Sequence, residues 1–498
     1  MDGRRTLDDR CGPEGVRLRC VLADAEIVGA DDVCVSHCTT DAAACRDGDL
    51  FVLLSDDKCA ATDAVRLGAA AIVAARPLAD CPVPVCYVPD AAEAYGRICQ
   101  ALAGRPSDRL KVIGVAGSYG KTTTGYLIAS ILSGAGQTPG VLSSLGYCDG
   151  LEVCDARWTT PPAPIMASWL RRMSENGCTH AVVEVSGRGA LEWRTAGMSF
   201  DVLCLTNLRS DDDARGCTVD GRRYAQRLLD QLRPEGVLVV NADDACGAWA
   251  ADRHDGPVLT VGLEHEAELT AVVLERFSSE QTFCLSLGDE AIPVRTTLPG
   301  DHNVLNSLLA AAVGSVYRLP PAALARGIES VRDLPGRLER IECGQPYTVF
   351  VDEARTPQAL STCLQALRGT TRSRLRCVLS AAELHDRTTR ARFARVAEQW
   401  ADETIVTQSP SSSATAELLD DVAAGFRRPS QQRIVADRAD AIRQTLTSAE
   451  PGDCVLVAGQ GSDTYQLPDR EQDYWDDRQL VRQTLYSLDY STAVRRAA

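Results

Sequence analysis

The segment GVAGSYGKTTT at residues 114–124 decides the fold of this chain. An aliphatic run, KVIGVAG, leads into it and predicts a buried strand at 111–117, and KTTTGYLIASIL predicts a helix at 121–132. Glycines allow the chain to turn tightly between these elements, so that backbone N–H groups and the start of the helix face an anion. A strand, a glycine-rich loop and a helix in this order predict a phosphate-binding loop.

The side chains of this loop suit a nucleoside triphosphate. Lys121 would neutralise the β- and γ-phosphates, and the hydroxyl of Thr122 would ligate Mg²⁺. Val115 stands where the strict GxxxxGK[ST] pattern has its first glycine, so a glycine-rich turn without function is the alternative. The flanking strand and helix favour ATP binding over that alternative. The predicted nucleotide-binding residues of the loop are Gly117, Gly120, Lys121, Thr122 and Thr123.

Strand and helix patterns continue on both sides of the loop. Aliphatic runs at 179–186, 201–208 and 236–244 are separated by helical or loop segments, which predicts a mostly parallel sheet with crossover helices. A chain of 498 residues exceeds what one hydrophobic core organises. We therefore predict an α/β protein of three domains, with boundaries at the segments AGRPSD and PGRLER. The predicted domains are an N-terminal α/β domain at 1–105, a central ATP-binding domain at 106–334 and a C-terminal Rossmann-like domain at 335–498.

Composition restricts the class of partner. A formal charge of −16 opposes a nucleic-acid or acidic-membrane surface, which needs clustered positive charge, although a small anionic ligand can still occupy a local basic pocket. The chain shows no apolar run of about 18 residues and no apolar segment of a signal peptide near its start, so we expect a cytoplasmic protein without a membrane partner. We also expect a monomer. Many of the 20 cysteines lie inside aliphatic runs, such as Cys204, Cys377 and Cys454, and are predicted to be core residues.

Further segments match one family in order along the chain. The loop variant GxxGxxGKTTT is typical of Mur ligases, and the whole set resembles the UDP-N-acetylmuramoyl-tripeptide synthetases most closely. The matching segments are TTP at 159–161, EVS at 184–186, TNL at 206–208, NADD at 241–244, GDHNVLN at 300–306, PGRLER at 335–340, DEARTP at 352–357 and AGQGSDTYQ at 458–466.

The resemblance implies roles for individual residues. Glu184, at the end of a predicted strand, matches the family's Mg²⁺-binding glutamate. Asn303 matches an asparagine that approaches the adenine. Arg337 matches an arginine that binds phosphate, and Asp352 matches an aspartate that touches the ribose. The positions that match contacts to the UDP-muramoyl peptide are Thr159, Thr160, Ser186 and Arg194.

The activity implied by the resemblance is an ATP-dependent amide ligation in peptidoglycan synthesis. An acceptor carboxylate on a UDP-muramoyl-peptide-like substrate is activated as an acyl phosphate, and the amine of an amino acid then attacks it. ATP and Mg²⁺ are the implied cofactors. The resemblance also implies that the N-terminal domain binds the UDP-containing precursor.

Two ligands of the family's second Mg²⁺ are missing. Arg188 stands at the position of a histidine ligand, and the position of a carbamoylated lysine falls near Ala225 or Gln226. The only lysines are Lys58, Lys111 and Lys121, so no carbamoyl-lysine can form at that place. We hypothesise that Arg188 is a catalytic residue together with Lys121 and Glu184, its guanidinium replacing the lost ion. The alternative is that Arg188 pairs with Glu184 or Asp211 in a site that no longer works.

Substrate motifs also differ from the family pattern. The DSR segment that recognises uridine in relatives reads Asp41-Ala42-Ala43, and the DNPR motif that grips the incoming amino acid reads Gln408-Ser409-Pro410-Ser411. The identity of the amino acid therefore cannot be carried over. These losses keep a second function open, that of a catalytically impaired, nucleotide-binding paralogue with a scaffolding or regulatory role.

Overall fold

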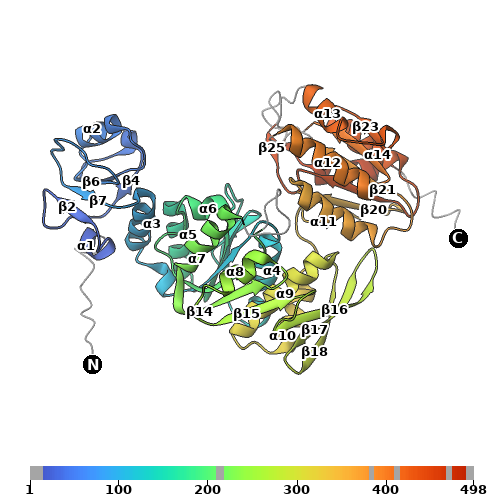
Figure 1. Cartoon of the computed structure of the whole chain (residues 1–498), viewed down its shortest axis with the longest axis horizontal. Helices are drawn as coiled ribbons and strands as arrows, with labels where there is room; N and C mark the ends of the chain where they lie inside the picture. Colours follow the sequence, from blue (N-terminus) through green and yellow to red (C-terminus); the bar gives the residue numbers. More distant parts are fainter. Residues whose placement is uncertain (1–14, 209–217, 381–385, 409–415, 467–473, 489–498) are drawn as a thin grey trace. The chain divides into compact units, whose positions relative to one another are not determined.

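The computed structural model of the chain (Figure 1) describes residues 15–208, 218–380, 386–408, 416–466 and 474–488. The chain packs as two compact units. The first comprises residues 1–125, 135–208 and 216–259, and the second comprises residues 126–134, 209–215 and 260–498. Among the described residues, no helix is long and apolar enough to cross a membrane.

The first unit begins with a five-stranded sheet of order β2-β7-β6-β5-β4. Strands β4 to β7 run parallel, and β2 joins the edge antiparallel to β7. Aliphatic side chains on the central strands of this sheet, such as Leu50, Val52 and Val73, are buried. The elements of this part are β1 (Val16–Arg17), α1 (Leu18–Val21), β2 (Glu26–Val28), β3 (Cys34–Val35), β4 (Cys38–Thr39), η1 (Ala42–Ala44), β5 (Leu50–Leu53), α2 (Lys58–Arg66), β6 (Ala71–Ala74), β7 (Val85–Tyr87) and α3 (Ala91–Leu102).

Within a second sheet, the strands of the first unit have the order β11-β10-β9-β12-β8-β13-β14. Its central strands β9, β12, β8, β13 and β14 are parallel, as the alternation of strands and helices predicted. Cys204 is fully buried in β13, as expected for a core residue. The elements are η2 (Pro106–Asp108), β8 (Lys111–Ala116), α4 (Lys121–Gly134), β9 (Pro139–Ser143), β10 (Gly146–Cys148), β11 (Val153–Cys154), α5 (Ala163–Glu175), β12 (His180–Val185), α6 (Gly187–Leu191), β13 (Phe200–Leu205), α7 (Val219–Leu229), β14 (Leu232–Asn241) and α8 (Ala245–Ala251).

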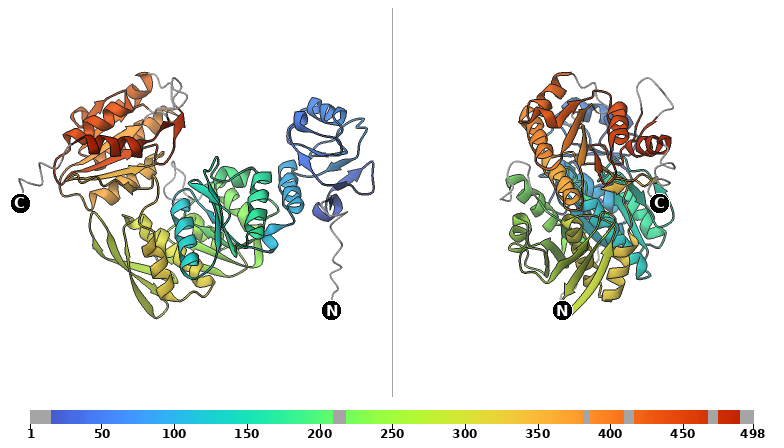
Figure 2. Two further views of the ribbon diagram at one scale, coloured as in Figure 1. Left: turned by 180° about the vertical axis from the view of Figure 1, so that it is seen from behind. Right: turned by 90° about the vertical axis from the view of Figure 1, so that its right-hand side faces the viewer.

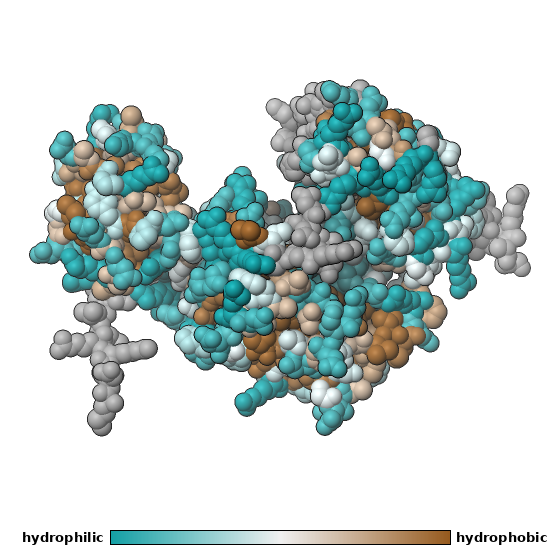
Figure 3. Space-filling model, in the orientation of Figure 1, coloured by the Kyte–Doolittle hydropathy of each residue, from teal (hydrophilic) through white to brown (hydrophobic). Residues whose placement is uncertain are grey.

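The second unit starts with strands in the order β15-β16-β17-β18. Strands β16, β17 and β18 are antiparallel, and the long helix α9 is almost entirely buried along its length. The surface in Figure 3 is largely hydrophilic with scattered hydrophobic patches, and Val272 and Leu274 of β16 are among the exposed apolar residues. The elements are β15 (Val258–Gly262), β16 (Leu269–Arg276), β17 (Gln281–Leu287), β18 (Glu290–Thr296), α9 (Asp301–Val316) and α10 (Pro321–Ser330).

The last sheet has the order β19-β20-β24-β21-β22-β23, parallel except for β19. Helices cover both of its faces (Figures 1 and 2), with α11, α12 and α13 packed on one apolar core and α14 and α15 on the other. This is the doubly wound arrangement expected of a Rossmann-like domain. The elements are β19 (Glu339–Arg340), β20 (Thr348–Asp352), α11 (Pro357–Arg368), β21 (Leu375–Ser380), α12 (Arg387–Trp400), β22 (Glu403–Thr407), α13 (Ala416–Ala423), η3 (Pro429–Gln431), β23 (Gln432–Ile434), α14 (Arg438–Ser448), β24 (Cys454–Ala458), β25 (Tyr465–Gln466), β26 (Tyr474–Trp475) and α15 (Asp477–Ser487).

Candidate active site

The predicted phosphate loop joins the end of β8 to the start of α4. Gly117 has a φ of +149°, and a Cβ at this position would lie 2.0 Å from Oγ1 of Thr206. Only glycine therefore fits at this turn. Asn207 closes the loop from β13, since its Oδ1 accepts from the N–H of Tyr119 at 3.1 Å and its Nδ2 donates to the carbonyl of Tyr119 at 3.0 Å. The TNL segment thus fixes the shape of the phosphate loop.

Three predicted site residues meet behind this loop. The hydroxyl of Thr122 lies 3.1 and 3.0 Å from the two carboxylate oxygens of Glu184, and Nζ of Lys121 lies 4.0 Å from Oε1 of Glu184. Lys121 also donates to the carbonyl of Ser118 at 3.2 Å. Glu184 is only 4% exposed, and Thr123 is buried beside Thr122 in the first turn of α4. The parallel pairing of β8 with β12 produces this convergence, because it brings the ends of both strands to one edge.

Two further residues of this site were missed in the sequence. The backbone N–H of Ser144 donates to Oε2 of Glu184 at 3.0 Å, and its hydroxyl lies 3.0 Å from Oγ1 of Thr122. The hydroxyl of Tyr224 accepts from the N–H of Gly117 at 3.1 Å and donates to the carbonyl of Val185. Ser144 directly follows the aliphatic strand β9, and a polar residue at such a strand end was the signal that could have found it. Nothing local marked Tyr224.

The oxygen atoms around Glu184 form a suitable donor set for Mg²⁺. A carboxylate and two hydroxyls, from Thr122 and Ser144, are the hard ligands that Mg²⁺ prefers, and phosphate oxygens and waters usually complete its shell. Lys121 already balances the charge of the buried Glu184 carboxylate, so the phosphates of the nucleotide would balance the charge of Mg²⁺. Elsewhere, the described residues contain no cluster of three or more His, Cys, Asp or Glu side chains that could hold a metal ion.

The predicted substrate contacts form a second network next to Glu184. Oγ1 of Thr160 donates to the backbone carbonyl of Glu184 at 2.9 Å and accepts from the N–H of Ser186, also at 2.9 Å. Nη1 of Arg194 donates to the carbonyl of Thr160 at 2.7 Å. Thr159 precedes Thr160 and is half-buried. The TTP segment and the residues after β12 are therefore joined into one surface.

Arg188 does not contact Glu184. Its side chain is 79% exposed, and Nε donates to Oε1 of Glu192 at 2.6 Å, one turn along α6. Glu192 also accepts from Arg194, and the two guanidinium groups lower the pKa of its carboxyl, with the hydrogen bond from Arg188 the largest cause. The alternative that Arg188 pairs with Glu184 is therefore wrong, and Asp211 lies outside the described residues.

The two residues near the family's lysine position cannot be carbamoylated, because neither has a side-chain amine. Ala225 is fully buried on α7. Gln226 is exposed, and its Nε2 donates to Oδ1 of Asp230 at 2.9 Å. The side chain of Gln226 thus makes a contact within its own helix.

Two of the predicted nucleotide contacts in the second unit lie at the ends of elements, Asn303 at the start of α9 and Asp352 at the end of β20. Asn303 is buried in the first turn of α9, where Nδ2 donates to the carbonyl of Pro299 at 2.8 Å and Oδ1 accepts from Asn306 at 3.1 Å. Asp352 ends β20, and burial raises the pKa of its carboxyl although it accepts from the N–H of Leu338 and of Ala354, each at 2.7 Å.

Arg337 directly precedes Leu338, whose N–H donates to Asp352. Its guanidinium forms an ion pair with Glu353. Gly336 before it has a φ of +63°, and a Cβ there would lie 2.1 Å from the backbone nitrogen of Ser462. The PGR segment, the end of β20 and the loop after β24 therefore pack as one group. The replaced DNPR motif lies mainly within residues 409–415, outside the described residues.

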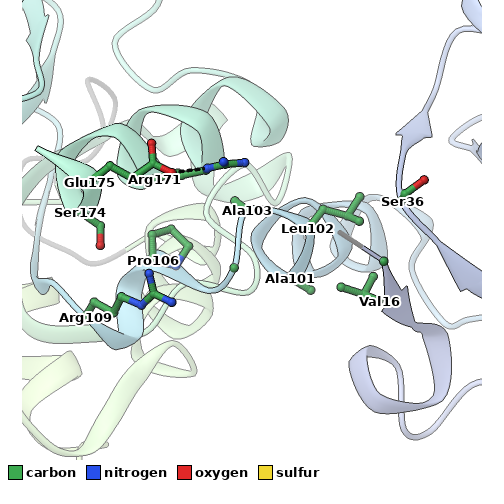
Figure 4. Close-up of a pocket in the computed structure, with 12 residues that line it drawn as sticks. Val16, Ser36, Ala101, Leu102, Ala103, Pro106, Arg109, Arg171, Ser174 and Glu175 are labelled. Carbon is green, nitrogen blue, oxygen red and sulfur yellow. Dashed lines mark hydrogen bonds and ion pairs between the residues drawn. The ribbon is translucent and has the colours of Figure 1, made fainter. Parts of the chain in front are cut away.

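A cavity of about 360 Å³ lies elsewhere in the first unit (Figure 4). It is bounded by the carboxyl ends of α3 and α5, and its lining includes Leu102, Pro106, Arg109 and Arg171. Nε of Arg171 donates to Glu175 at 2.7 Å. None of the predicted site residues lines this cavity.

Comparison with known proteins agrees with this geometry. The Mur ligase middle domain matches residues 115–314, and the Mur ligase glutamate ligase domain matches residues 336–461. The chain is 31% identical over 472 residues to the UDP-N-acetylmuramoyl-L-alanyl-D-glutamate–2,6-diaminopimelate ligase of Bacillus licheniformis, covering 92% of this chain and 96% of that one. It is also 31% identical over 481 residues to a UDP-N-acetylmuramyl-tripeptide synthetase of a Roseiflexus species, covering 90% and 94%.

Solved structures share the fold. One is a UDP-N-acetylmuramoyl-L-alanyl-D-glutamate–2,6-diaminopimelate ligase, with a TM-score of 0.67 at 22% identity over 95% of this chain and 99% of that one. Another is the MurF ligase of Thermotoga maritima in complex with ADP, with a TM-score of 0.59 at 17% identity over 91% and 98%. The fold and the site define an α/β ligase of three-domain type. The chain belongs to the Mur ligase family.

Proposed function

We propose that this protein is an ATP-dependent ligase that adds an amino acid to a UDP-N-acetylmuramoyl-peptide precursor in peptidoglycan synthesis. The observation that carries the proposal is the convergence of Lys121, Thr122 and Glu184 behind a loop that only glycine can form at Gly117. Relatives whose names describe this reaction match nearly the whole chain. These relatives are ligases by name, and they lend no support to an impaired paralogue.

The end of the phosphate loop and the start of α4 supply the groups that would bind the nucleotide in this reaction. Backbone N–H groups of the loop and Nζ of Lys121 bind the triphosphate. The precursor's carboxylate attacks the γ-phosphorus, the bond from that phosphorus to the bridging oxygen breaks, and ADP leaves. The amine of the amino acid then attacks the acyl carbon, the bond from that carbon to the phosphate oxygen breaks, and phosphate and a proton from the amine leave as the amide forms. Mg²⁺ held by Thr122 and Glu184 would neutralise phosphate charge when bound.

The substrate network supports a binding site for the precursor beside this centre. Thr160 is hydrogen-bonded to the backbone of Glu184 and Ser186, so a precursor bound by Thr159, Thr160, Ser186 and Arg194 would lie next to the metal-binding carboxylate. We further propose that Asn303, Arg337 and Asp352 contact the nucleotide and that the domains are 1–105, 106–334 and 335–498. The proposed compartment is the cytoplasm, where ATP is available, and the proposed oligomeric state is a monomer.

Phosphate release from ATP tests the function. Purified full-length protein is incubated with ATP, Mg²⁺ and UDP-muramoyl dipeptide against a panel of amino acids that includes 2,6-diaminopimelate and lysine. We expect release with one amino acid or a few related ones, with the product gaining the mass of that residue. Lys121→Ala should abolish the release, and Lys58→Ala on the exposed helix α2 is the matched control. No release with any acceptor would favour the impaired paralogue instead.

A further inference from the structure

Two thiols face each other inside the first unit. Sγ of Cys38, on β4, lies 3.9 Å from Sγ of Cys99, on α3. A disulfide has a sulfur–sulfur distance of about 2.05 Å, so the two atoms need to approach by less than about 2 Å, which side-chain rotation can supply. Cys38 is half-buried, whereas Cys99 is 5% exposed. The pair is therefore poised to form a covalent bond, with Cys38 as the more accessible partner.

The two thiols connect to the turn that follows β4. Cys38 begins β4 (Cys38–Thr39), which leads directly into Thr40 and Asp41. Oδ1 of Asp41 accepts from the N–H of Ala43 at 2.9 Å. The thiol pair is thus joined through the backbone after Cys38 to the turn at 39–43, which occupies the place of the family's uridine-binding segment.

The thiol pair also packs on a second substrate segment. Cys99, Ala163 and Ala167 form one buried apolar cluster, and Cys38 and Tyr95 pack against it. Ala163 begins helix α5, directly after the TTP segment that contains Thr160. A movement of Cys99 therefore reaches both segments that are expected to hold the UDP-muramoyl peptide.

We propose that Cys38 and Cys99 are a site of reversible oxidation, and that closing their disulfide weakens binding of the UDP-muramoyl peptide. A hydroperoxide is the oxidant. The sulfur of Cys38 attacks one peroxide oxygen, the O–O bond breaks, and a sulfenic acid and water form. The sulfur of Cys99 then attacks the sulfenic sulfur, whose S–O bond breaks to release a second water. Two thiols lose two electrons, peroxide is reduced to water, and a thiol reductant restores both cysteines by exchange.

The local environment sets the order in which the two thiols react. Its hydrogen bond with Cys38, together with burial, raises the pKa of the Cys99 thiol, so the first attack on the peroxide falls to the more exposed Cys38, and the proton of Cys99 leaves with the second water. Closing the disulfide removes the S–H of Cys99 and moves its sulfur toward β4. Cys38 is displaced in the opposite direction, and the position of Thr40, two residues after it, changes with it.

Peptide mapping tests bond formation without any assay of activity. The full-length protein is treated with hydrogen peroxide, and free thiols are alkylated without reduction. The masses of proteolytic fragments are then measured by mass spectrometry. A fragment pair joined through Cys38 and Cys99, lost after treatment with dithiothreitol, is the expected result. The pair should be absent in Cys38→Ser and in Cys99→Ala and present in Cys59→Ser, which removes an exposed thiol of α2. Circular dichroism establishes that each variant is folded. Absence of the linked pair in the parent protein would overturn the proposal.

Kinetics then test the coupling to substrate. The effect on substrate binding rests on the proposed function, whereas disulfide formation does not. Oxidation should raise KM for the UDP-muramoyl peptide at least about fivefold, the factor that corresponds to one lost hydrogen bond, and leave KM for ATP unchanged. The same oxidation of Cys38→Ser should leave both values unchanged. A disulfide that forms without changing KM for the precursor would refute the coupling.

Discussion

The hydroxyl of Thr122 lies 3.1 and 3.0 Å from the two carboxylate oxygens of Glu184 and so joins the first turn of α4 to the end of β12. This contact spans 62 residues of sequence and links the two groups that would share a Mg²⁺ ion. Since both side chains are buried, the carboxylate is oriented before any ligand arrives. Such pre-organisation lowers the cost of assembling the site when nucleotide binds.

Replacing Lys121 by alanine should remove most of the affinity for ATP. Lys121 supplies the only lysine side chain near the loop, and its Nζ already lies 3.2 Å from the loop carbonyl of Ser118. Isothermal titration calorimetry of the variant with ATP and with ADP is the measurement. Lys111→Ala, which removes an exposed lysine that pairs with Asp201, should bind like the parent. Unchanged nucleotide affinity in Lys121→Ala would show that the phosphate loop has been wrongly assigned.

Bicarbonate should have no effect on turnover. Carbamoylation needs a lysine amine, and the chain has no lysine after Lys121. Of the two residues near the family's lysine position, Ala225 is fully buried and Gln226 is hydrogen-bonded to Asp230. Steady-state rates with and without added bicarbonate at constant pH and ionic strength are to be compared, with a Mg²⁺ titration at each condition. A rate that rises with bicarbonate, or a second metal near Gln226 in a nucleotide-bound crystal, would contradict this prediction.

Replacing Arg188 by alanine should lower turnover about a hundredfold or more with little change in nucleotide affinity. An arginine that stabilises charge during phosphoryl transfer typically raises turnover by at least about this factor. In the ligand-free structure Arg188 pairs with Glu192, so it must exchange that partner for a phosphoryl oxygen when substrates bind. Glu192→Gln weakens the competing pair and is the companion variant, which should retain turnover. An Arg188→Ala enzyme as fast as the parent would refute the hypothesis.

Acidification should destabilise the protein partly through His302. Burial lowers the pKa of this imidazole to about 4, below its usual value near 6.5. Between these two values the unfolded chain binds a proton that the folded chain does not, so stability falls as the pH drops from about 6.5 to about 4. Thermal unfolding midpoints across this range should fall less steeply for His302→Gln. His37→Gln, which changes a side chain that is 62% exposed, serves for comparison. Equal slopes for His302→Gln and the parent would contradict the prediction.

The sequence by itself determined the local features of this protein. The aliphatic run before Gly117 and the helix pattern after Lys121 depend only on residues next to one another, so the strand, loop and helix could be read without knowing any other contact. The same holds for the absence of a carbamoyl-lysine, which follows from the residue types alone. The family resemblance supplied Glu184 and Thr160 as candidate site residues; Glu184 contacts Thr122 of the loop, and Thr160 is hydrogen-bonded to the backbone of Glu184.

Only the tertiary structure decided which distant side chains complete the site. Strand β12 lies between β9 and β8, an order that alternating strands and helices do not specify, and this order brings Ser144 within hydrogen-bonding distance of Glu184. Tyr224 reaches Gly117 across 107 residues because α7 packs its buried face, including Tyr224, against the core of this sheet. The partner of Arg188 is Glu192 because helical spacing places the two on one exposed face, where water and a short reach favour a local ion pair over a buried one. Periodicity fixes each element, whereas the packing of elements fixes which side chains meet.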